Sequence, residues 1–288
     1  MYSSYWNAYI DDPRLMLIPM EDHLVHRGDG VFEAFKIING KIYLMKEHFD
    51  RLERSAEALS LNWPLPRAEV EKVLKEMIEI KKVQTAGLRI FLSRGMGTFS
   101  ANPYDSKQAH FHFLMINSKM PSAEKYALGA SLGRSQIEPK GAPWSEIKSC
   151  NYLPNVLMKK EAVDRGLDFT LGFDEQGFIT ECSTENLIIL DQKNQLCRPQ
   201  LRRILKGTTM MRVFELAQKL VPTGKIKSTI ERNISESDLF AAKELMIVGT
   251  TWDVLSVTKY EGKNIFDGKV GAISKELLSL LQEDQTGS

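Results

Sequence analysis

Residues 146–162 read EIKSCNYLPNVLMKKEA, and the interpretation of the whole chain starts from this stretch. A short apolar run passes into a helix that carries Leu153, Val156 and Leu157 on one face. This pattern places Lys148 at the end of an element, where its side chain can point into a pocket. Most lysines are solvated surface charges, so Lys148 gains meaning only from the segments that follow it.

Residues 173–190 read FDEQGFITECSTENLIIL, which predicts a strand, a turn at Gly177 and a second strand. Glu181 stands at the head of the second strand, close to the hydroxyl residues Ser183 and Thr184. A buried carboxylate at this place needs a cationic partner, and a protonated pyridine nitrogen would supply one. By keeping such a nitrogen charged, the carboxylate would strengthen the ring as an electron sink.

Residues 202–220 read RRILKGTTMMRVFELAQKL, in which Gly207, Thr208 and Thr209 come directly before an amphipathic helix. Backbone N–H groups at such a helix start can cradle a phosphate. A threonine there is more often a simple N-cap, and that alternative stays open. A second hydroxyl pair, Thr250 and Thr251, follows the apolar strand ELMIVG at the end of a buried element, where alone it would be only a turn.

Residues 48–60, HFDRLERSAEALS, place His48, Arg51 and Ser55 on neighbouring turns of one helix. Arg51 pairs either with a doubly charged phosphate or, at the surface, with Asp50 or Glu47. Surface pairing is the commoner case on helices, so both interpretations are kept.

The order of elements predicts an α+β protein with two domains, 1–120 and 121–288. A β-hairpin is expected over 29–45, with its turn at Asn39-Gly40. The polar stretch 117–125 is the predicted linker, and the loop 94–107 is long enough to be a candidate functional segment. Helices are predicted at 46–61, 71–82, 152–165, 209–220 and 272–282, and strands at 88–93, 110–117, 127–137, 169–174, 178–180, 186–191 and 244–259.

Composition narrows the function classes. The 38 basic and 37 acidic residues give a formal charge of +1. A chain so close to neutral has no strong long-range electrostatic attraction for nucleic acid or anionic membranes. No stretch is apolar for long enough to cross a bilayer and no leader segment is evident, so we expect a cytoplasmic protein. Cys150, Cys182 and Cys197 lie far apart, which argues against a disulfide framework or a metal site.

Taken together, these segments resemble the fold-type IV pyridoxal-phosphate enzymes, the family of branched-chain and D-amino-acid aminotransferases and aminodeoxychorismate lyase. The resemblance spans nearly the whole chain and implies a smaller N-terminal α/β sandwich, a larger C-terminal β-barrel-like domain with helices, and a site at the domain interface. Its pieces occur in the family's order: GDGVFEAFK from Gly28, HFDRLERS from His48, IKSCNYLPNVL from Ile147, ITECSTENL from Ile179, ILKGTT from Ile204 and VGTTWDV from Val248.

The resemblance also implies a role for each candidate residue. Lys148 would hold pyridoxal 5'-phosphate as a Schiff base and would move the α-proton of an amino acid, so that the amino group passes to a 2-oxo acid. Glu181 would contact the pyridine nitrogen, and Tyr152 would face the phenolic oxygen of the ring. The phosphate would be bound by Arg51, Gly207, Thr208, Thr209 and Thr250.

Departures from the family pattern bear on the substrate. Met210 stands where the phosphate segment commonly has an arginine, with Arg212 as the nearby substitute. Tyr152 lies four positions after Lys148, as in the D-amino-acid aminotransferase and lyase branches, which disfavours a standard branched-chain enzyme. Phe32 stands where the D-amino-acid branch has a tyrosine for the substrate carboxylate.

Substrate contacts are therefore sought elsewhere. Arg94 in the long loop and Lys36 on the opening hairpin are the candidate cations for a carboxylate, although each is equally explained as a solvated charge, and Thr251 is a further candidate. The Thr250-Thr251 pair favours transamination. The alternatives are elimination of pyruvate from 4-amino-4-deoxychorismate and cofactor binding without turnover. A homodimer is expected, because in family members the site lies near a subunit interface.

Overall fold

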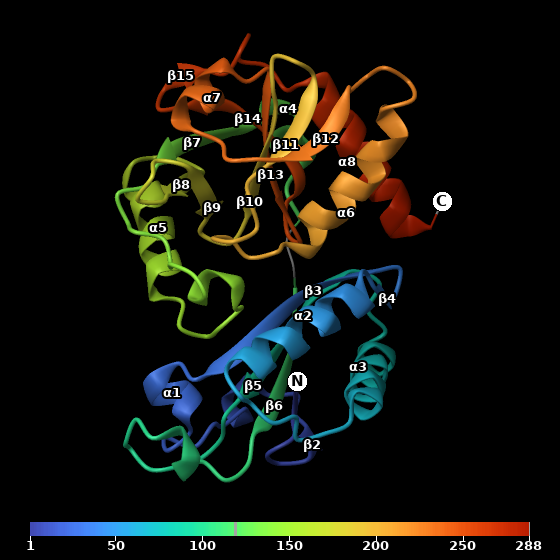
Figure 1. Cartoon of the computed structure of the whole chain (residues 1–288). Coiled ribbons are helices and arrows are strands. Elements are labelled where there is room, and N and C mark those ends of the chain that lie inside the picture. The colour runs from blue at the N-terminus through green and yellow to red at the C-terminus, as the bar shows by residue number, and fades with distance from the viewer. Residues whose placement is uncertain (118–119, 288) are drawn as a thin grey trace. The chain divides into compact units, whose positions relative to one another are not determined.

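The computed structural model describes residues 1–117 and 120–287, and the chain forms two compact units (Figure 1). The first unit holds the residues up to 117 together with Ile147–Tyr152, and the second holds Met120–Glu146 and residues 153–287. The predicted linker 117–125 includes residues 118 and 119, which lie outside the described residues. The division into domains 1–120 and 121–288 stays a prediction, and the segment around Lys148 belongs to the first unit.

The first unit is built on an antiparallel sheet with the strand order β2-β1-β6-β5-β3-β4. Its strands are β1 (Tyr2–Ser3), β2 (Ala8–Tyr9), β3 (Gly30–Ile38), β4 (Lys41–Ile42), β5 (Ala86–Ser93) and β6 (His110–Ile116). Its helices are α1 (His23–Arg27), α2 (Met45–Ala58) and α3 (Arg67–Lys81), with 3-10 turns at Pro13–Leu15 and Pro103–Asp105.

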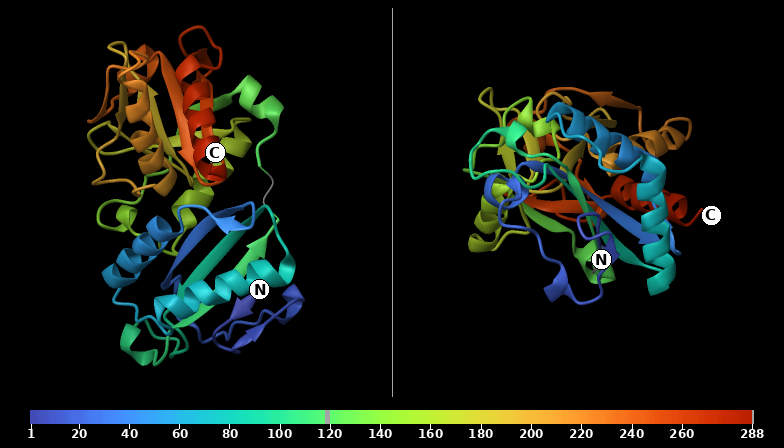
Figure 2. Two further views of the ribbon diagram at one scale, coloured as in Figure 1. Left: turned by 90° about the vertical axis from the view of Figure 1, so that its right-hand side faces the viewer. Right: turned by 90° about the horizontal axis from the view of Figure 1, so that it is seen from below.

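Helices α2 and α3 cover one face of this sheet (Figure 2). Because side chains alternate across a strand, Val31, Phe35 and Ile37 of β3 point to the covered face and are buried in the core of the unit. Glu33 follows the same alternation and has a side chain that is 0% exposed. A carboxylate therefore occupies a core-facing position on β3.

The second unit contains a mixed sheet with the order β12-β11-β10-β13-β14-β7-β8-β9, and β15 pairs with β14. Pairs β11/β12, β14/β7 and β7/β8 are parallel. The strands are β7 (Ala130–Arg134), β8 (Phe169–Phe173), β9 (Ile179–Cys182), β10 (Asn186–Leu190), β11 (Gln195–Arg198), β12 (Ser228–Glu231), β13 (Glu244–Gly249), β14 (Asp253–Tyr260) and β15 (Lys263–Asn264). The helices are α4 (Ala123–Leu128), α5 (Leu153–Asp164), α6 (Thr208–Ala217), α7 (Glu236–Ala241) and α8 (Ala272–Thr286), with 3-10 turns at Trp144–Glu146 and Gln218–Leu220.

Local patterns predicted most of these elements. The hairpin is confirmed as β3 and β4, and both turn residues have positive φ, 50° at Asn39 and 71° at Gly40, as a two-residue turn that matches the strand twist requires. The strand predicted over 127–137 is shorter, because Ser122 caps α4 by accepting a hydrogen bond from the Lys125 N–H at 3.1 Å. The stretch 244–259 is two strands, and α1, α4, α7, β1, β2, β11, β12 and β15 were not predicted.

The apolar face predicted for α5 lies on its exposed side. Leu153 is 63% exposed and Val156 is 56% exposed, whereas Asn155, Met158 and Ala162 are buried. Helix α5 packs on β8, where the Thr170 hydroxyl donates a hydrogen bond to the Met158 carbonyl at 2.9 Å. The helix and its apolar face are as predicted, but the inward face of α5 is small and mixed in polarity, and the apolar face is exposed.

Candidate active site

The backbone of Lys148 is held against β3 and α2. The Phe32 N–H donates to the Lys148 carbonyl at 2.9 Å, and the Cys150 N–H donates to the Gly30 carbonyl at 2.8 Å. The Lys148 N–H donates to the Ser55 hydroxyl at 3.2 Å. Residues 148–150 thus run along the edge of β3 like a short added strand, which restricts where the Lys148 side chain can reach.

Two aromatic rings lie beside the amine of Lys148, a residue that is 7% exposed. Its Nζ lies 4.5 Å from the ring centroid of Phe32 and 5.9 Å from that of Tyr152. The two rings meet edge to face with centroids 5.2 Å apart, and Phe91 of β5 stacks on Phe32 at 5.8 Å. The ring at position 32 has no hydroxyl to offer a carboxylate, so it shapes an apolar wall beside the amine.

Arg51 is buried and is not paired with either acidic residue considered from the sequence. Its Nε donates to Glu33 Oε1 at 2.6 Å and its Nη2 donates to Glu33 Oε2 at 2.8 Å. The same carboxylate accepts from His48 Nδ1 at 2.7 Å. The surface alternative with Asp50 or Glu47 is therefore wrong: α2 turns His48, Arg51 and Ser55 inward, and its exposed face carries the acids.

The charges in this group follow from burial and pairing. Burial alone would raise the pKa of the Glu33 carboxyl, but the charge of Arg51 and the contact with His48 outweigh it, so the pKa lies well below its usual range. Burial lowers the pKa of His48, against the pull of Glu33. A carboxylate only accepts hydrogen bonds, so the neutral His48 ring carries its hydrogen on Nδ1.

Glu181 lies on β9 of the second unit. Its Oε2 accepts a hydrogen bond from the Leu205 N–H at 3.0 Å and from Asn186 Nδ2 at 3.4 Å. Asn186 Nδ2 also donates to the Leu205 carbonyl at 3.1 Å, so the amide ties Glu181 to the segment that leads into α6. Burial lowers the pKa of Lys140, and the nearby Glu181 carboxylate opposes that shift.

The start of α6 has the features of an anion site. Gly207 is its N-cap and provides no side-chain cap, and Thr208 and Thr209 of the first turn are buried. A Cβ atom at Gly207 would overlap Oδ1 of Asn186, so a larger residue would have to displace that amide. Asn186, which sequence reasoning missed, is thus shared by the glycine cradle and the Glu181 carboxylate.

Helix α6 also accounts for the departure at Met210. The Met210 side chain is fully buried and serves packing. Arg212, the candidate substitute, donates from Nε to Asp284 of α8 at 2.9 Å and from Nη1 to Glu215 at 2.8 Å. The contact with Asp284 joins α6 to α8, and the contact with Glu215 lies within α6, so Arg212 has a structural role in the second unit.

Thr250 and Thr251 lie in the tight turn between β13 and β14. The Trp252 N–H donates to the Gly249 carbonyl at 3.2 Å, and Asp253 closes the turn with a φ of 51°. Thr250 is half-buried and Thr251 is exposed. The sequence placed this pair correctly at the end of a buried strand.

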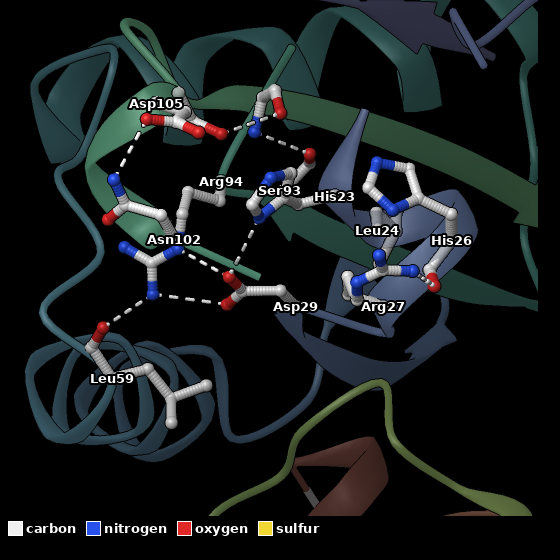
Figure 3. A network of polar contacts seen from close by, with 12 residues as sticks. His23, Leu24, His26, Arg27, Asp29, Leu59, Ser93, Arg94, Asn102 and Asp105 are labelled. Carbon is white, nitrogen blue, oxygen red and sulfur yellow. Dashed lines mark hydrogen bonds and ion pairs between the residues drawn. The ribbon is translucent and has the colours of Figure 1, made fainter. Parts of the chain in front are cut away.

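Lys36 and Arg94, the candidate substrate cations, differ in their surroundings. Lys36 is buried and projects from the same face of β3 as Phe32. Arg94 donates to the Asp29 carboxylate at 2.5 and 3.1 Å and to the Leu59 carbonyl at 2.7 Å (Figure 3). A role as a carboxylate clamp stays a prediction for both, and Arg94 would have to leave this network to act as one.

The donor set suits pyridoxal phosphate. The buried amine of Lys148 matches the cofactor's aldehyde, and the Glu181 carboxylate matches a pyridine nitrogen. The glycine cradle at Gly207 in the second unit and the guanidinium of Arg51 in the first unit are each chemically suited to a phosphate. Within residues 1–117 and 120–287, no group of three or more His, Cys, Asp or Glu side chains is arranged to hold a metal ion. Across those same residues, no helix combines the length and apolarity needed to span a bilayer.

Comparison with known proteins places the chain among the aminotransferases. The family model described as "Amino-transferase class IV" matches residues 30–260. The chloroplastic D-amino-acid transaminase of Arabidopsis thaliana is 32% identical over 99% of this chain and 76% of that protein. The D-alanine aminotransferase of Bacillus licheniformis is 27% identical over 92% of this chain and 90% of that protein.

The fold agrees with solved structures. A branched-chain amino acid aminotransferase crystallised with pyridoxamine 5'-phosphate has a TM-score of 0.90 at 24% identity, covering 96% of this chain and 92% of that chain. The branched-chain aminotransferase of the archaeon Thermoproteus uzoniensis has a TM-score of 0.87 at 22% identity, covering 97% of this chain and 93% of that chain. At these identities the likeness concerns the fold. The predicted two-domain α+β architecture and the predicted family resemblance are both confirmed.

Proposed function

Because this chain belongs to the class IV aminotransferase family, whose members depend on pyridoxal phosphate, we propose that it moves amino groups from D-amino acids to 2-oxo acids. The observation that carries the proposal is the buried Lys148 amine, fixed to β3 by its backbone and enclosed by the rings of Phe32 and Tyr152. The preference for D-amino acids is supported by the two relatives described above and by the four-residue spacing from Lys148 to Tyr152.

Lys148 is the proposed catalytic residue. When bound, pyridoxal phosphate supplies an aldehyde that links to a lysine amine and an electron-poor ring that stabilises negative charge at the substrate's α-carbon. The Nζ of Lys148 would hold the cofactor between turnovers, and its free amine would take the α-proton of the substrate and return it within the site. Phe32 and Phe91 exclude water from the region of this amine.

The remaining residues hold the cofactor in place. Glu181 would keep a proton at the pyridine nitrogen, and Tyr152 would face the ring's phenolic oxygen. Lys36, Arg94 and Thr251 are the proposed contacts of the substrate, with the two cations directed to its carboxylate. The phosphate is assigned to Arg51, Gly207, Thr208, Thr209 and Thr250.

A donor screen tests the reaction. The purified protein is mixed with D-alanine, L-glutamate or L-leucine and a 2-oxo acid, and amino exchange and the cofactor's absorbance are followed. We expect exchange with D-alanine to exceed exchange with either L-amino acid. Absence of exchange together with release of pyruvate from 4-amino-4-deoxychorismate would replace the proposal with the lyase alternative.

Borohydride reduction followed by peptide mapping tests the premise shared by both reactions. The cofactor label is expected on the peptide that contains Lys148. Label elsewhere would remove both enzyme assignments. Label on Lys148 without a spectral response to any amino donor would leave a cofactor binder without turnover.

We further propose a homodimer in the cytoplasm. The exposed apolar stripe on α5, formed by Leu153, Val156 and Leu157, supports a second copy as the covering partner, because exposed apolar patches of this kind commonly mark interfaces. Sedimentation at several concentrations tests the dimer, with Val156→Glu expected to yield monomers. Cell fractionation tests the compartment, and recovery in the membrane fraction would contradict it.

A further inference from the structure

Glu33 is an acidic residue at a core position. It lies between Val31 and Phe35 on the covered face of β3, and both neighbours on that face are buried hydrophobic residues. The same position filled by an apolar side chain would continue the core without interruption. A charge here needs a reason other than the packing of the sheet.

All contacts of the carboxylate described above lie on α2 and β3. Besides the two bonds from Arg51 and the one from His48, Oε2 accepts from the Ala34 N–H at 3.2 Å. The carboxylate holds the Nε and Nη2 edge of the guanidinium in a fork, which fixes the plane of the group. The direction of Nη1 is thereby set by the backbone of β3.

Stability alone does not explain this arrangement. Removing two charges from water opposes the attraction between them, so a buried ion pair is often no more stabilising than apolar side chains of similar volume. What the fork provides is a fixed orientation of the Arg51 guanidinium. A fixed orientation matters where a planar cation must bind an anion in one geometry.

We propose that Glu33 is a positioning residue for recognition of the cofactor's phosphate, acting by orienting the guanidinium of Arg51. This inference rests on the proposed role of Arg51 as a phosphate ligand. Glu33 itself does not touch the phosphate. His48, on the preceding turn of α2, donates a hydrogen bond to the same carboxylate. This second contact holds the carboxylate in the plane of the fork.

The competing explanation is a purely structural ion pair that joins α2 to β3. Such a pair predicts that changes at Glu33 lower the free energy of unfolding and affect every ligand alike. Positioning predicts an effect specific to the phosphate. Pyridoxal, which has the aldehyde and ring but no phosphate, separates the two explanations.

The experiment measures dissociation constants of pyridoxal phosphate and pyridoxal for the full chain after removal of its cofactor, from the absorbance of the lysine-bound form. Glu33→Gln keeps the shape of the side chain and loosens the fork. We expect a pyridoxal phosphate Kd about tenfold higher, as for a weakened charge-assisted hydrogen bond, and an unchanged Kd for pyridoxal. Equal changes for both ligands would overturn the inference.

A double variant guards against failure to fold. Glu33→Leu with Arg51→Met replaces the pair by apolar side chains of similar volume, so the chain is expected to fold. Its pyridoxal phosphate Kd should rise about a hundredfold, with pyridoxal unaffected. An unchanged pyridoxal phosphate Kd in this variant would remove the phosphate role of Arg51, and with it the inference. If the pyridoxal phosphate Kd rose in the double variant but stayed at the wild-type value in Glu33→Gln, Arg51 would keep its phosphate role and only the positioning role of Glu33 would be refuted.

Ile37→Ala is the matched control. Ile37 lies on the same face of β3, is fully buried and makes no contact with the fork, so its loss creates a cavity without touching Arg51. The ratio of the two dissociation constants should stay at the wild-type value. A changed ratio in this variant would mean that general loosening of the first unit, and not the fork, sets phosphate affinity.

Discussion

The backbone N–H of Lys148 donates a hydrogen bond to the hydroxyl of Ser55, 93 residues earlier in the chain. Ser55 lies one turn after Arg51 on α2, so a single helix face holds both the lysine backbone and the Glu33 fork. The position of the proposed catalytic amine and that of the proposed phosphate-binding cation are thus set by one helix.

Ser55→Ala is expected to loosen Lys148. The buried N–H loses its acceptor, at a cost of about 1–3 kcal/mol of unfolding free energy, and a shift of the amine should lower kcat by about tenfold or more. Urea unfolding and steady-state kinetics measure the two effects, and Ser55→Thr should retain most of the activity.

Ser145→Ala is the control for the Ser55 variant. Ser145 is equally buried, and its hydroxyl has no partner among the described residues, so its removal breaks no hydrogen bond. Unfolding and kinetics should match the wild type. If Ser55→Ala also matched it, the Ser55 contact would have no role in placing the lysine.

Gly207→Ala should damage the cofactor site through Asn186. The added methyl group overlaps Oδ1 of Asn186, so the amide must move and its bond to the Leu205 carbonyl breaks together with its contact to Glu181. We expect the Kd for pyridoxal phosphate to rise about tenfold or more, because both the helix start and the carboxylate are disturbed. Absorbance titration measures it.

Gly141→Ala is the comparison for Gly207→Ala. No atom lies within 4 Å of a Cβ placed at Gly141, and its φ is not in the left-handed region. Cofactor affinity should be unchanged there. Equal affinity in both variants would show that the cradle at Gly207 tolerates a side chain and that the proposed phosphate site lies elsewhere.

The sequence predicted the features that depend on neighbours along the chain. The Asn39-Gly40 turn, the position of Lys148 at an element end and the glycine before α6 are all local patterns. The fork at Glu33 was not predicted, because alternation along β3 says which face the residue shares but not that α2 places a cation there, 18 residues later. Asn186 was missed for the same reason, since its partners lie 5 and 19 residues away.

Asp29→Asn and Arg94→Lys distinguish the proposed clamp role of Arg94 from a role as an anchor of the long loop. If Arg94 is only an anchor, both substitutions should raise the substrate KM by similar factors and lower the unfolding free energy by about 1–2 kcal/mol each. The double variant should cost less than the sum, because both changes break the same pair. A raised KM in Arg94→Lys with a normal KM in Asp29→Asn would favour the direct clamp on the carboxylate.

Burial of His112 makes the first unit sensitive to acid. Burial lowers the pKa of His112 from 6.5 to about 4, with His110 adding to the shift and Asp22 opposing it. Its Nδ1 lies 3.3 Å from the Ser3 hydroxyl, where β6 pairs with β1. Below pH 6.5 His112 binds a proton in the unfolded chain, whereas in the folded chain it stays neutral until about pH 4. The free energy of unfolding therefore falls as the pH drops through this window.

His112→Gln should remove that part of the pH dependence. Between about pH 6.5 and 4.5 the wild type is expected to lose about 2 kcal/mol more unfolding free energy than the variant, as one histidine with this shift requires. His48, whose pKa burial also lowers, contributes equally to both proteins and cancels in the difference. His110, whose pKa burial also lowers, is coupled to His112, so its contribution cancels only in part. Glu33, whose pKa is lowered, adds its loss only below this window. Urea unfolding at each pH gives the two curves, and parallel curves would mean that His112 titrates normally in the folded chain.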